Sequence, residues 1–111
     1  MVFFDPASAK LTPQARAILD NAAASYRTCG PAAIYIMGHT DRKGADEANM
    51  ALSKIEAASV RAYLISRGLP AKLMVIRGFG ETRPLVETAD GVSEPQNRRV
   101  EIVYQPEGSA W

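Results

Sequence analysis

The sequence predicts an α/β (α+β) two-layer sandwich in which two helices pack on one face of a sheet of mixed direction. The chain has 111 residues, 47% of them apolar, which suits a single compact core. Short apolar, β-prone segments alternate with two long segments that have helical periodicity. Because alternating strands and helices bury the apolar side of one layer against the other, these observations favour the two-layer arrangement.

The first strand and the first helix are bounded by prolines. Residues 2–4 are apolar and β-prone, and this strand should stop before Pro6, because proline fixes φ. Thr12 is a hydroxyl N-cap before Pro13 at the first helical position, and a Gly-Pro pair at 30–31 should end the helix. Apolar spacings of three and four predict a buried stripe that consists of Ala15, Ile18, Leu19, Ala22 and Tyr26.

The middle of the chain predicts a strand, a helix and another strand. Residues 32–37 are an almost continuous apolar run between turn signals, which predicts a central strand covered on both faces. A second helix is expected over residues 46–67, because Gly68 and Pro70 provide a glycine terminator and a following proline. Residues 72–77 then predict the third strand.

The last part of the chain contains a long connection and one more strand. Residues 81–97 are rich in turn residues, and a connection of this length in a small domain is more often functional than idle. Residues 99–104 alternate in polarity, so a half-exposed strand is expected, with Val100 on its buried face. The domain is expected to span residues 1–105, and residues 106–111 are expected to form a flexible tail.

Composition excludes several classes of protein. The 13 basic and 12 acidic residues give a formal net charge of only +1, so nucleic-acid binding is not expected. A single cysteine, Cys29, excludes an internal disulfide and a cysteine-cluster zinc site. No apolar run approaches the roughly 18 residues of a membrane span, so this domain is not expected to insert directly into a membrane. Met1 leads directly into the first strand, which suggests a module of a longer protein.

A polar segment follows the central strand. Asp41 ends the Gly-His-Thr-Asp segment at 38–41, just before a short turn into the second helix. In α/β sheets, ligands tend to bind beyond the carboxyl ends of strands, so Asp41 is placed to accept a hydrogen bond from a cationic group. The alternative is that its carboxylate only caps the turn, as Asx residues often do.

One carboxylate falls on the core-facing side of the second helix. At 100° per residue, this stripe consists of Asn49, Leu52, Ser53, Glu56, Val60 and Tyr63. A buried unpaired charge costs several kcal/mol, so Glu56 should reach a cleft, extend to water, or pair with Arg98 or Arg99. The polar members lie in the first half of the helix, near Asp41, which favours a cleft. An internal ion pair is the alternative.

Enzyme classes and metal sites find little support in the sequence. His39 is the only histidine, and with Asp41 it offers at most two metal ligands. No glycine-flanked serine or cysteine signature is present, and the glycines at 78 and 80 lack the third glycine of a dinucleotide loop. A glycosidase with Asp41 and Glu56 as its carboxylate pair is the weakest hypothesis. We expect no enzyme activity, cofactor or metal.

Taken in order, short motifs along the chain resemble those of the OmpA-like C-terminal domain. The resemblance covers residues 2 to about 104 and is carried by segments throughout the chain. These are Phe3-Phe4-Asp5, Leu11-Thr12, Gly38-His39-Thr40-Asp41 with Gly44, Asn49 with Leu52-Ser53, Val60 with Tyr63-Leu64, Gly68, Gly78-Phe79-Gly80-Glu81 with Pro84, and Asn97-Arg98-Arg99-Val100-Glu101-Ile102. The Gly-His-Thr-Asp and Asn-Arg-Arg segments together are highly specific.

The resemblance implies a βαβαββ domain that binds the peptide stem of peptidoglycan, without covalent chemistry, in the periplasm of Gram-negative bacteria. Members of the family include outer-membrane porin tails, peptidoglycan-associated lipoproteins and flagellar stator subunits. The ligand in the family is chiefly diaminopimelate, whose distal end carries an ammonium and a carboxylate. An acid and a base set apart recognise such an end well, because each charge is then satisfied.

The resemblance also implies roles for particular residues. Asp41 meets the ammonium, and an arginine fifteen positions later meets the carboxylate. Asn49, the backbone near Thr40 and the loop after the first strand help to hold the stem. Adjacent arginines in a strand point to opposite faces, so only one of Arg98 and Arg99 can face this site. Arg98 is included among the expected ligand-binding residues.

The sequence departs from the family pattern at this arginine position, where it has Glu56. A carboxylate there would face the carboxylate of the ligand, which should weaken binding at least roughly a thousandfold. Ala7 is a lesser departure. We expect Glu56 to lie at a cleft rather than in the deep core, turned towards Lys43, Arg98 or Arg99.

Two explanations of Glu56 remain open. It is an introduced charge reversal, which the otherwise intact motif favours, or it is natural. In the second case the domain binds a differently charged stem or serves only as a structural or protein-interaction module.

Overall fold

The computed structural model describes residues 1–5, 8–29 and 32–106, and its elements follow the order expected from the sequence. The strands and helices are β1 (Val2–Phe3), α1 (Pro13–Cys29), β2 (Ala32–His39), α2 (Asp46–Ser66), β3 (Met74–Gly78) and β4 (Arg99–Pro106). Short 3-10 turns, η1 (Ala71–Leu73) and η2 (Pro95–Asn97), precede β3 and β4. The βαβαββ order is therefore confirmed.

Some expectations fall beyond what the structure describes or shift by a residue or two. The predicted helix end at 30–31, Ala7, and residues 107–111 of the expected tail lie outside the described residues. α2 ends one residue earlier than expected, and Gly68 follows it with a positive φ of 94°, as a glycine terminator should. β3 begins two residues later than expected, because η1 takes up the start of the predicted strand.

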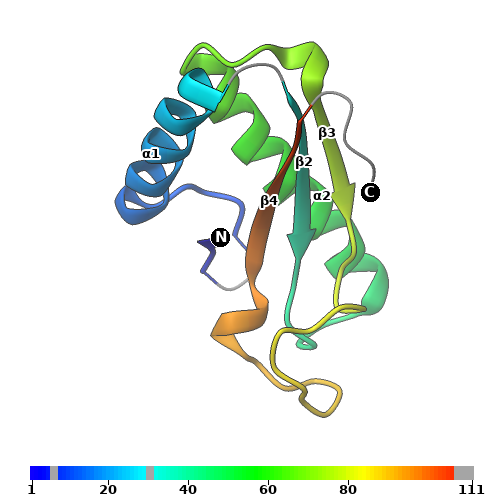
Figure 1. The fold of residues 1–111 in the computed structure, drawn as a ribbon. Helices are drawn as coiled ribbons and strands as arrows, with labels where there is room; N and C mark the ends of the chain where they lie inside the picture. Colours follow the sequence, from blue (N-terminus) through cyan, green and yellow to red (C-terminus); the bar gives the residue numbers. More distant parts are fainter. Residues whose placement is uncertain (6–7, 30–31, 107–111) are drawn as a thin grey trace.

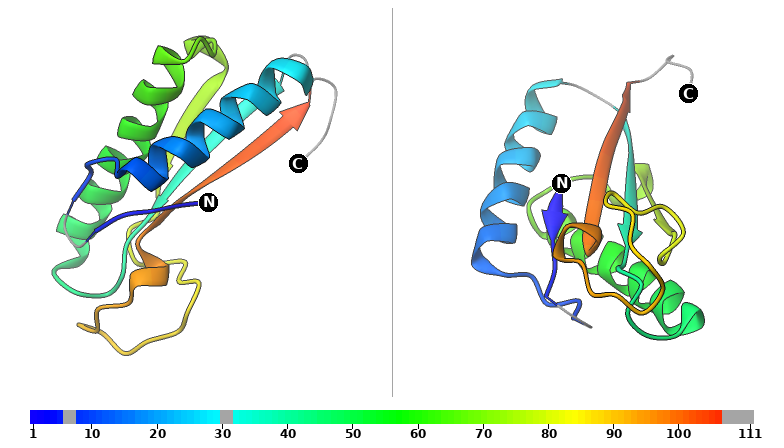
Figure 2. Two further views of the ribbon diagram at one scale, coloured as in Figure 1. Left: turned by 90° about the vertical axis from the view of Figure 1, so that its left-hand side faces the viewer. Right: turned by 90° about the horizontal axis from the view of Figure 1, so that it is seen from below.

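The strands form one mixed sheet in the order β1-β4-β2-β3 (Figure 1). β2 runs parallel to β3 and antiparallel to β4, and β4 also pairs antiparallel with β1. Both helices lie on one face of this sheet (Figure 2). The predicted two-layer sandwich with a sheet of mixed direction is therefore confirmed.

The exposure of β2 differs from the prediction. The strand is central, as predicted, because β3 and β4 flank it. Its side chains nevertheless alternate: Ile34 and Ile36 are fully buried, whereas Tyr35 and Met37 are only half-buried. Because the described helices cover one face only, the expectation that this apolar run is covered on both faces is wrong.

The buried row of α1 differs from the prediction at Ile18, which is exposed, and at Ala22, which is only half-buried and gives its place in the row to Ala23. Thr12 caps the helix as expected, since its Oγ1 accepts a hydrogen bond from the N–H of Ala15 (3.1 Å). The row that contacts the core consists of Ala15, Leu19, Ala23 and Tyr26. Ile18 is 42% exposed, because at 100° per residue it lies off the edge of this row, whereas Ala23 lies within it.

The core lies between the helices and the inner face of the sheet. Its fully buried large apolar side chains include Val2, Leu19, Ile34, Ile36, Val60, Leu64 and Val100. Three polar side chains, those of Ser53, Glu56 and Asn97, are buried as completely as these. Polar groups buried to this degree need hydrogen-bond partners, so their surroundings bear directly on function.

Two glycines let the first half of α2 approach the sheet closely. Gly38 and Gly78 are paired in register on β2 and β3, and a Cβ at Gly38 would overlap the backbone carbonyl of Ser53. Ser53 makes use of this proximity, because its Oγ accepts a hydrogen bond from the N–H of Gly80 (3.0 Å). Glu56 follows Ser53 by one helical turn, so this contact sets how deeply the Glu56 side chain enters the fold.

We expect Gly38→Ala to lower the free energy of unfolding by about 3 kcal/mol, because the added methyl group would push α2 away from the sheet. Chemical denaturation followed by circular dichroism measures this loss. Gly91→Ala is the control, since a Cβ there meets open space and only its positive φ adds a cost, of about 1–2 kcal/mol. Equal losses in the two variants would contradict a close approach of Gly38 to Ser53.

Candidate functional site

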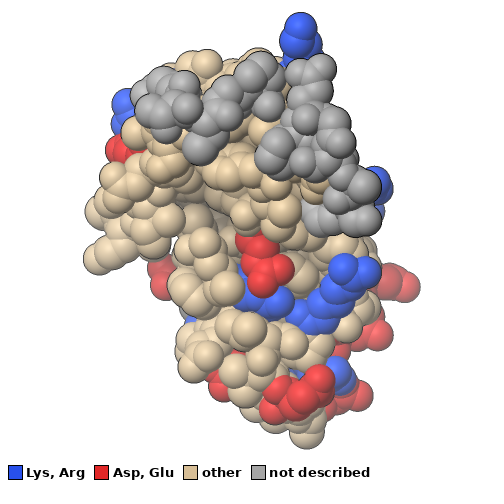
Figure 3. Space-filling view, in the orientation of Figure 1, with Lys and Arg blue, Asp and Glu red and all other residues tan. Residues whose placement is uncertain are grey.

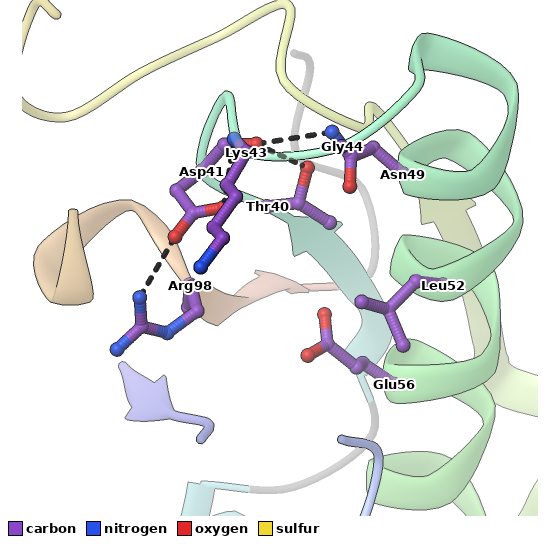
Figure 4. A pocket seen from close by; sticks show the side chains of 8 residues that line it. All are labelled: Thr40, Asp41, Lys43, Gly44, Asn49, Leu52, Glu56 and Arg98. Atoms are coloured by element: carbon purple, nitrogen blue, oxygen red, sulfur yellow. Dashed lines mark hydrogen bonds and ion pairs between the residues drawn. The ribbon is translucent and has the colours of Figure 1, made fainter. Parts of the chain in front are cut away.

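A pocket of about 280 Å³ opens where β2 ends and α2 begins, beside the start of β4 (Figure 4). It is lined by Thr40, Asp41, Lys43, Gly44, Asn49, Leu52, Glu56 and Arg98. All five residues that the sequence suggests for a ligand site, at positions 40, 41, 49, 56 and 98, are among them. Asp41 and Glu56 therefore share one hollow, as the hypothesis of a common recognition pocket requires.

Asp41 makes a different contact with each carboxylate oxygen. Oδ2 accepts hydrogen bonds from Nη1 of Arg98 (2.7 Å), the N–H of Glu94 (3.1 Å) and the hydroxyl of Ser93 (3.2 Å). Oδ1 accepts a hydrogen bond from the N–H of Lys43 (3.2 Å), which is an Asx turn. The turn-capping interpretation of Asp41 is thus correct for Oδ1, while Oδ2 forms an ion pair.

This ion pair is buried, with side-chain exposures of 8% for Asp41 and 11% for Arg98. Burial raises the pKa of the Asp41 carboxyl, but hydrogen bonds from Arg98 and from the N–H groups of Glu94 and Lys43 outweigh it. The net pKa therefore lies below its ordinary value of 3.8. Asp41 is ionised at neutral pH and carries the negative charge of the pocket.

Arg98 joins three distant parts of the chain at the pocket. Besides the bond to Asp41, its Nε donates to the backbone carbonyl of Phe4 (3.2 Å) and its Nη1 to the hydroxyl of Ser93 (2.9 Å). Arg99 points to the opposite face of the sheet, where it pairs with Glu101 (3.3 Å). The prediction that only one of these adjacent arginines faces the site is confirmed.

The outer face of the sheet carries charges of both signs. His39 lies there with Nε2 3.3 Å from Glu101, close to Arg99. Burial, with a smaller contribution from Arg99, lowers the pKa of His39 to about 4, so His39 is neutral at neutral pH. Figure 3 shows acidic and basic side chains next to one another on this face. Charge is compensated locally there, as the balanced composition suggests.

Thr40 and Asn49 use their donor atoms within the protein. Nδ2 of Asn49 donates to the backbone carbonyl of Asp41 (3.3 Å) and to Oε1 of Glu81 (3.2 Å). The N–H of Thr40 donates to the carbonyl of Gly80 (2.8 Å), and its hydroxyl donates to the carbonyl of Asp41 (3.0 Å). These hydrogen bonds hold the loop after β2 against α2, so both residues shape the pocket.

Glu56 enters the pocket from α2 and is only 1% exposed. Its carboxyl group points away from the helix, into the space between α2 and the side chains of Lys43 and Arg98 (Figure 4). Its Oε1 accepts no hydrogen bond from the described residues, and it takes part in none of the ion pairs found among them. Glu56 therefore lies at a cleft, as expected, but its side chain is as buried as those of the core. The expected turn towards a basic partner forms no ion pair, because Arg98 already pairs with Asp41 and Arg99 faces the other side.

Burial also decides the charge of Glu56. It raises the pKa of this carboxyl to about 8, an effect that nearby Arg98 partly offsets and that Asp41 reinforces. At neutral pH the Glu56 side chain is therefore mainly protonated and neutral. The pocket thus holds two carboxyl groups in opposite states, one ionised and paired, the other neutral and without a hydrogen-bond donor to Oε1 among the described residues.

Sequence reasoning does not identify Ser93, Glu94 or Lys43 as site residues. Ser93 and Glu94 are 52 and 53 positions from Asp41, and only the length of the 81–97 connection marks their segment as functional. Lys43 contributes its backbone N–H to the Asx turn, so the turn-capping interpretation already implies a contact two residues after Asp41.

Two further findings concern the described residues as a whole. The described residues contain no group of three or more His, Cys, Asp or Glu side chains that could hold a metal ion. In the same part of the chain, no helix combines the length and apolar character needed to cross a membrane.

The site is thus a small pocket, lined mainly by polar residues, beyond the central strand of a two-layer βαβαββ fold. The chain belongs to the OmpA family, whose sequence profile matches residues 3–98. The resemblance inferred from the motifs is therefore confirmed. OmpA-like domains are non-enzymatic anchoring domains of envelope proteins.

Two of the curated relatives are named as an outer membrane protein and a peptidoglycan-associated lipoprotein. The chain is 38% identical over 111 residues to a peptidoglycan-associated lipoprotein of Rhizobium meliloti, covering 97% of this chain and 61% of that protein. It is 41% identical over 109 residues to an outer membrane protein of Gluconacetobacter diazotrophicus, covering 93% of this chain and 29% of that protein. The chain thus spans less than two thirds of the length of these relatives.

Solved structures share the fold. The peptidoglycan-associated lipoprotein from Burkholderia pseudomallei matches with a TM-score of 0.85 at 34% identity, covering 94% of this chain and 88% of that one. The C-terminal domain of Helicobacter pylori MotB matches with a TM-score of 0.80 at 22% identity, covering 96% and 84% of the two chains. The second likeness concerns the fold alone.

We expect Asp41→Asn to lower the free energy of unfolding by about 3–5 kcal/mol, because Arg98 would keep its charge in a buried site without a carboxylate. Denaturant titration measures the loss. Asp90→Asn is the matched control, since Asp90 pairs with Arg42 at 3.0 Å but its side chain is 88% exposed. That variant should lose less than about 1 kcal/mol. Similar losses in both would show that burial adds nothing to the role of Asp41.

Glu56 should make the fold less stable as pH rises. The pKa of Glu56 is about 8 in the folded protein, against an ordinary value of 4.5, so the unfolded chain loses this proton first. Glu56 contributes its full stabilisation when the pH is below its ordinary pKa of 4.5. This contribution declines as the pH rises, and it levels off above the pKa of about 8 in the folded protein. The total decline is about 5 kcal/mol.

His39 acts in the opposite direction at lower pH. Its pKa is about 4 in the folded protein against an ordinary 6.5, so its contribution to stability rises over that interval. The measurement is therefore the difference in unfolding free energy between the unchanged chain and Glu56→Gln, from about pH 5 to 9. A difference that stays constant with pH would contradict a raised pKa of Glu56.

Proposed function

We propose that this chain is a non-catalytic, periplasmic peptidoglycan-binding domain that anchors an outer-membrane or envelope protein to the cell wall. Its membership of the OmpA family and its relatives named as peptidoglycan-associated lipoproteins support the proposal. The observation that carries it is that Asp41 and position 56, the acid and base positions of the family motif, line one pocket.

In this proposal the ligand is the diaminopimelate of the peptide stem. Its ammonium meets Asp41, which is ionised and whose Oδ1 accepts only one hydrogen bond among the described residues, from Lys43. A carboxylate oxygen can accept a second donor, so the ammonium has an acceptor available. Arg98 orients Asp41, and Asn49 and Thr40 hold the loop that carries it.

The carboxylate of diaminopimelate then reaches the neutral carboxyl of Glu56 instead of an arginine. Loss of a charge-assisted partner costs about 2–5 kcal/mol, which corresponds to about thirtyfold to several thousandfold in affinity. The sequence also suggests that repulsion between two carboxylates weakens binding. This repulsion contributes little at neutral pH, because Glu56 is mainly protonated. Weak binding to the wall thus follows from a missing positive charge.

A structural or protein-interaction module of the same fold is the second candidate. The observation that favours it is that Asp41 and Arg98 already neutralise each other in the absence of a ligand. Both candidates, and both a natural and an introduced Glu56, predict that the unchanged chain binds a stem with a free distal carboxylate only weakly. They differ in what happens when the family arginine is restored.

We expect Glu56→Arg to increase binding to purified peptidoglycan with free diaminopimelate carboxylates by at least about thirtyfold, because a guanidinium pairs bidentately with a carboxylate. Co-sedimentation of the protein with purified cell wall, at constant salt concentration, measures the gain. The unchanged chain should remain largely in the supernatant.

The control is the double variant that combines Asp41→Asn with Glu56→Arg, which should lose the restored binding because the ammonium has no partner. Glycan strands stripped of peptide stems should retain neither protein. If a folded Glu56→Arg protein, checked by circular dichroism, still fails to bind the wall, the second candidate describes the domain better.

A further inference from the structure

The pocket contains a buried acceptor to which none of the described residues donates a hydrogen bond. Oε1 of Glu56 accepts no hydrogen bond from the described residues, although the side chain is almost completely buried and lines the pocket. A buried polar atom without a hydrogen bond destabilises the free pocket, so a ligand that donates to it gains affinity. The other polar groups differ: Asp41 has Arg98, and the donors of Asn49 and Thr40 are bound internally.

The neutral form of Glu56 narrows the kind of ligand group that fits. A protonated carboxyl presents an O–H donor and a carbonyl acceptor side by side in one plane. A primary carboxamide is its complement, because the amide N–H donates to the carboxyl oxygen while the amide oxygen accepts from the O–H. The pair forms two parallel hydrogen bonds, the same two-point contact that an arginine makes with a carboxylate.

A free carboxylate fits this position less well. It can accept the O–H of Glu56, but it offers no donor to Oε1, which stays unsatisfied. It also brings a negative charge into a buried site near Asp41, whose arginine partner is already engaged. Lys43, the other basic residue of the lining, is an exposed residue. The unsatisfied Oε1 and the added negative charge therefore both disfavour the carboxylate relative to its amide.

We propose that this pocket selects a peptide stem in which the diamino acid carries a carboxamide in place of its distal carboxylate, with Glu56 as the residue that determines this specificity. Asp41 binds the ammonium next to the amide, as in the proposed function on which this inference rests. Glutamate thus replaces the family arginine in the protein, and an amide replaces the carboxylate in the ligand. Residue 56 and the ligand still form two parallel hydrogen bonds.

The test uses two synthetic stem peptides that differ only in whether the distal carboxyl of diaminopimelate is free or amidated. Isothermal titration calorimetry measures both peptides against the unchanged chain and against Glu56→Arg. The unchanged chain should prefer the amidated stem by at least about tenfold, since its acceptor and donor are both paired only there. Glu56→Arg should prefer the free carboxylate by a similar factor.

Glu56→Gln separates hydrogen bonding from charge. A glutamine side chain also offers one donor and one acceptor, so this variant should keep the preference for the amidated stem. Glu56→Leu, which offers neither, should lose it. Binding of the amidated stem by the unchanged chain should weaken above about pH 8, where Glu56 loses its O–H, and Glu56→Gln should show no such change. The charged groups that face residue 56, Asp41 and Arg98, are the same in both proteins.

The outcomes distinguish this inference from the proposed function. If Glu56→Arg binds the free-carboxylate stem but the unchanged chain binds the two stems equally or binds neither, the inference is overturned and wall anchoring stands. If neither protein binds either stem, the proposed function fails as well. If Glu56→Arg does not fold, the preference of the unchanged chain and its loss in Glu56→Leu still decide the inference.

Discussion

The pocket depends on the buried ion pair between Asp41 and Arg98. This pair joins the loop after β2 to the start of β4, and the further bonds of Arg98 to Phe4 and Ser93 bring in the end of β1 and the long connection. A buried ion pair adds little net stability compared with apolar packing, because both charges lose their hydration. Its effect here is geometric, since four separate segments meet at fixed positions around one carboxylate.

The same pocket shows how surroundings give two carboxyl groups different chemistry. Asp41 is buried but receives hydrogen bonds from an arginine and from backbone N–H groups, so its charge is retained. Glu56 is buried by the close docking of α2 on the two glycines of β2 and β3, and it receives no comparable support from the described residues. Glu56 is therefore neutral at neutral pH. The pocket thus offers one charged group, Asp41, and one group that interacts only through hydrogen bonds, Glu56.

Local patterns in the sequence account for most of the fold. Helical spacing, the Thr12 cap and the glycine terminator at Gly68 are encoded by neighbouring residues, so the elements and their order are predictable. The errors arise where contacts with other elements determine burial, as on the partly exposed outer face of β2 and at Ile18. Positions 41 and 56 follow from a motif, but the contacts of Ser93 and Glu94 and the charge of Glu56 depend on how distant segments pack.

The position of β4 in the sheet has a consequence for how the domain is made. β4 is the last described strand of the chain yet lies between β1 and β2, and Arg98, directly before it, completes the pocket across 57 positions of sequence. During synthesis, a chain that stops short of β4 lacks both the central pairing of the sheet and one side of the binding site. Contacts of such long sequence separation form late and slowly. In a nascent or truncated chain the pocket therefore stays incomplete, and it closes only when the domain folds as a whole.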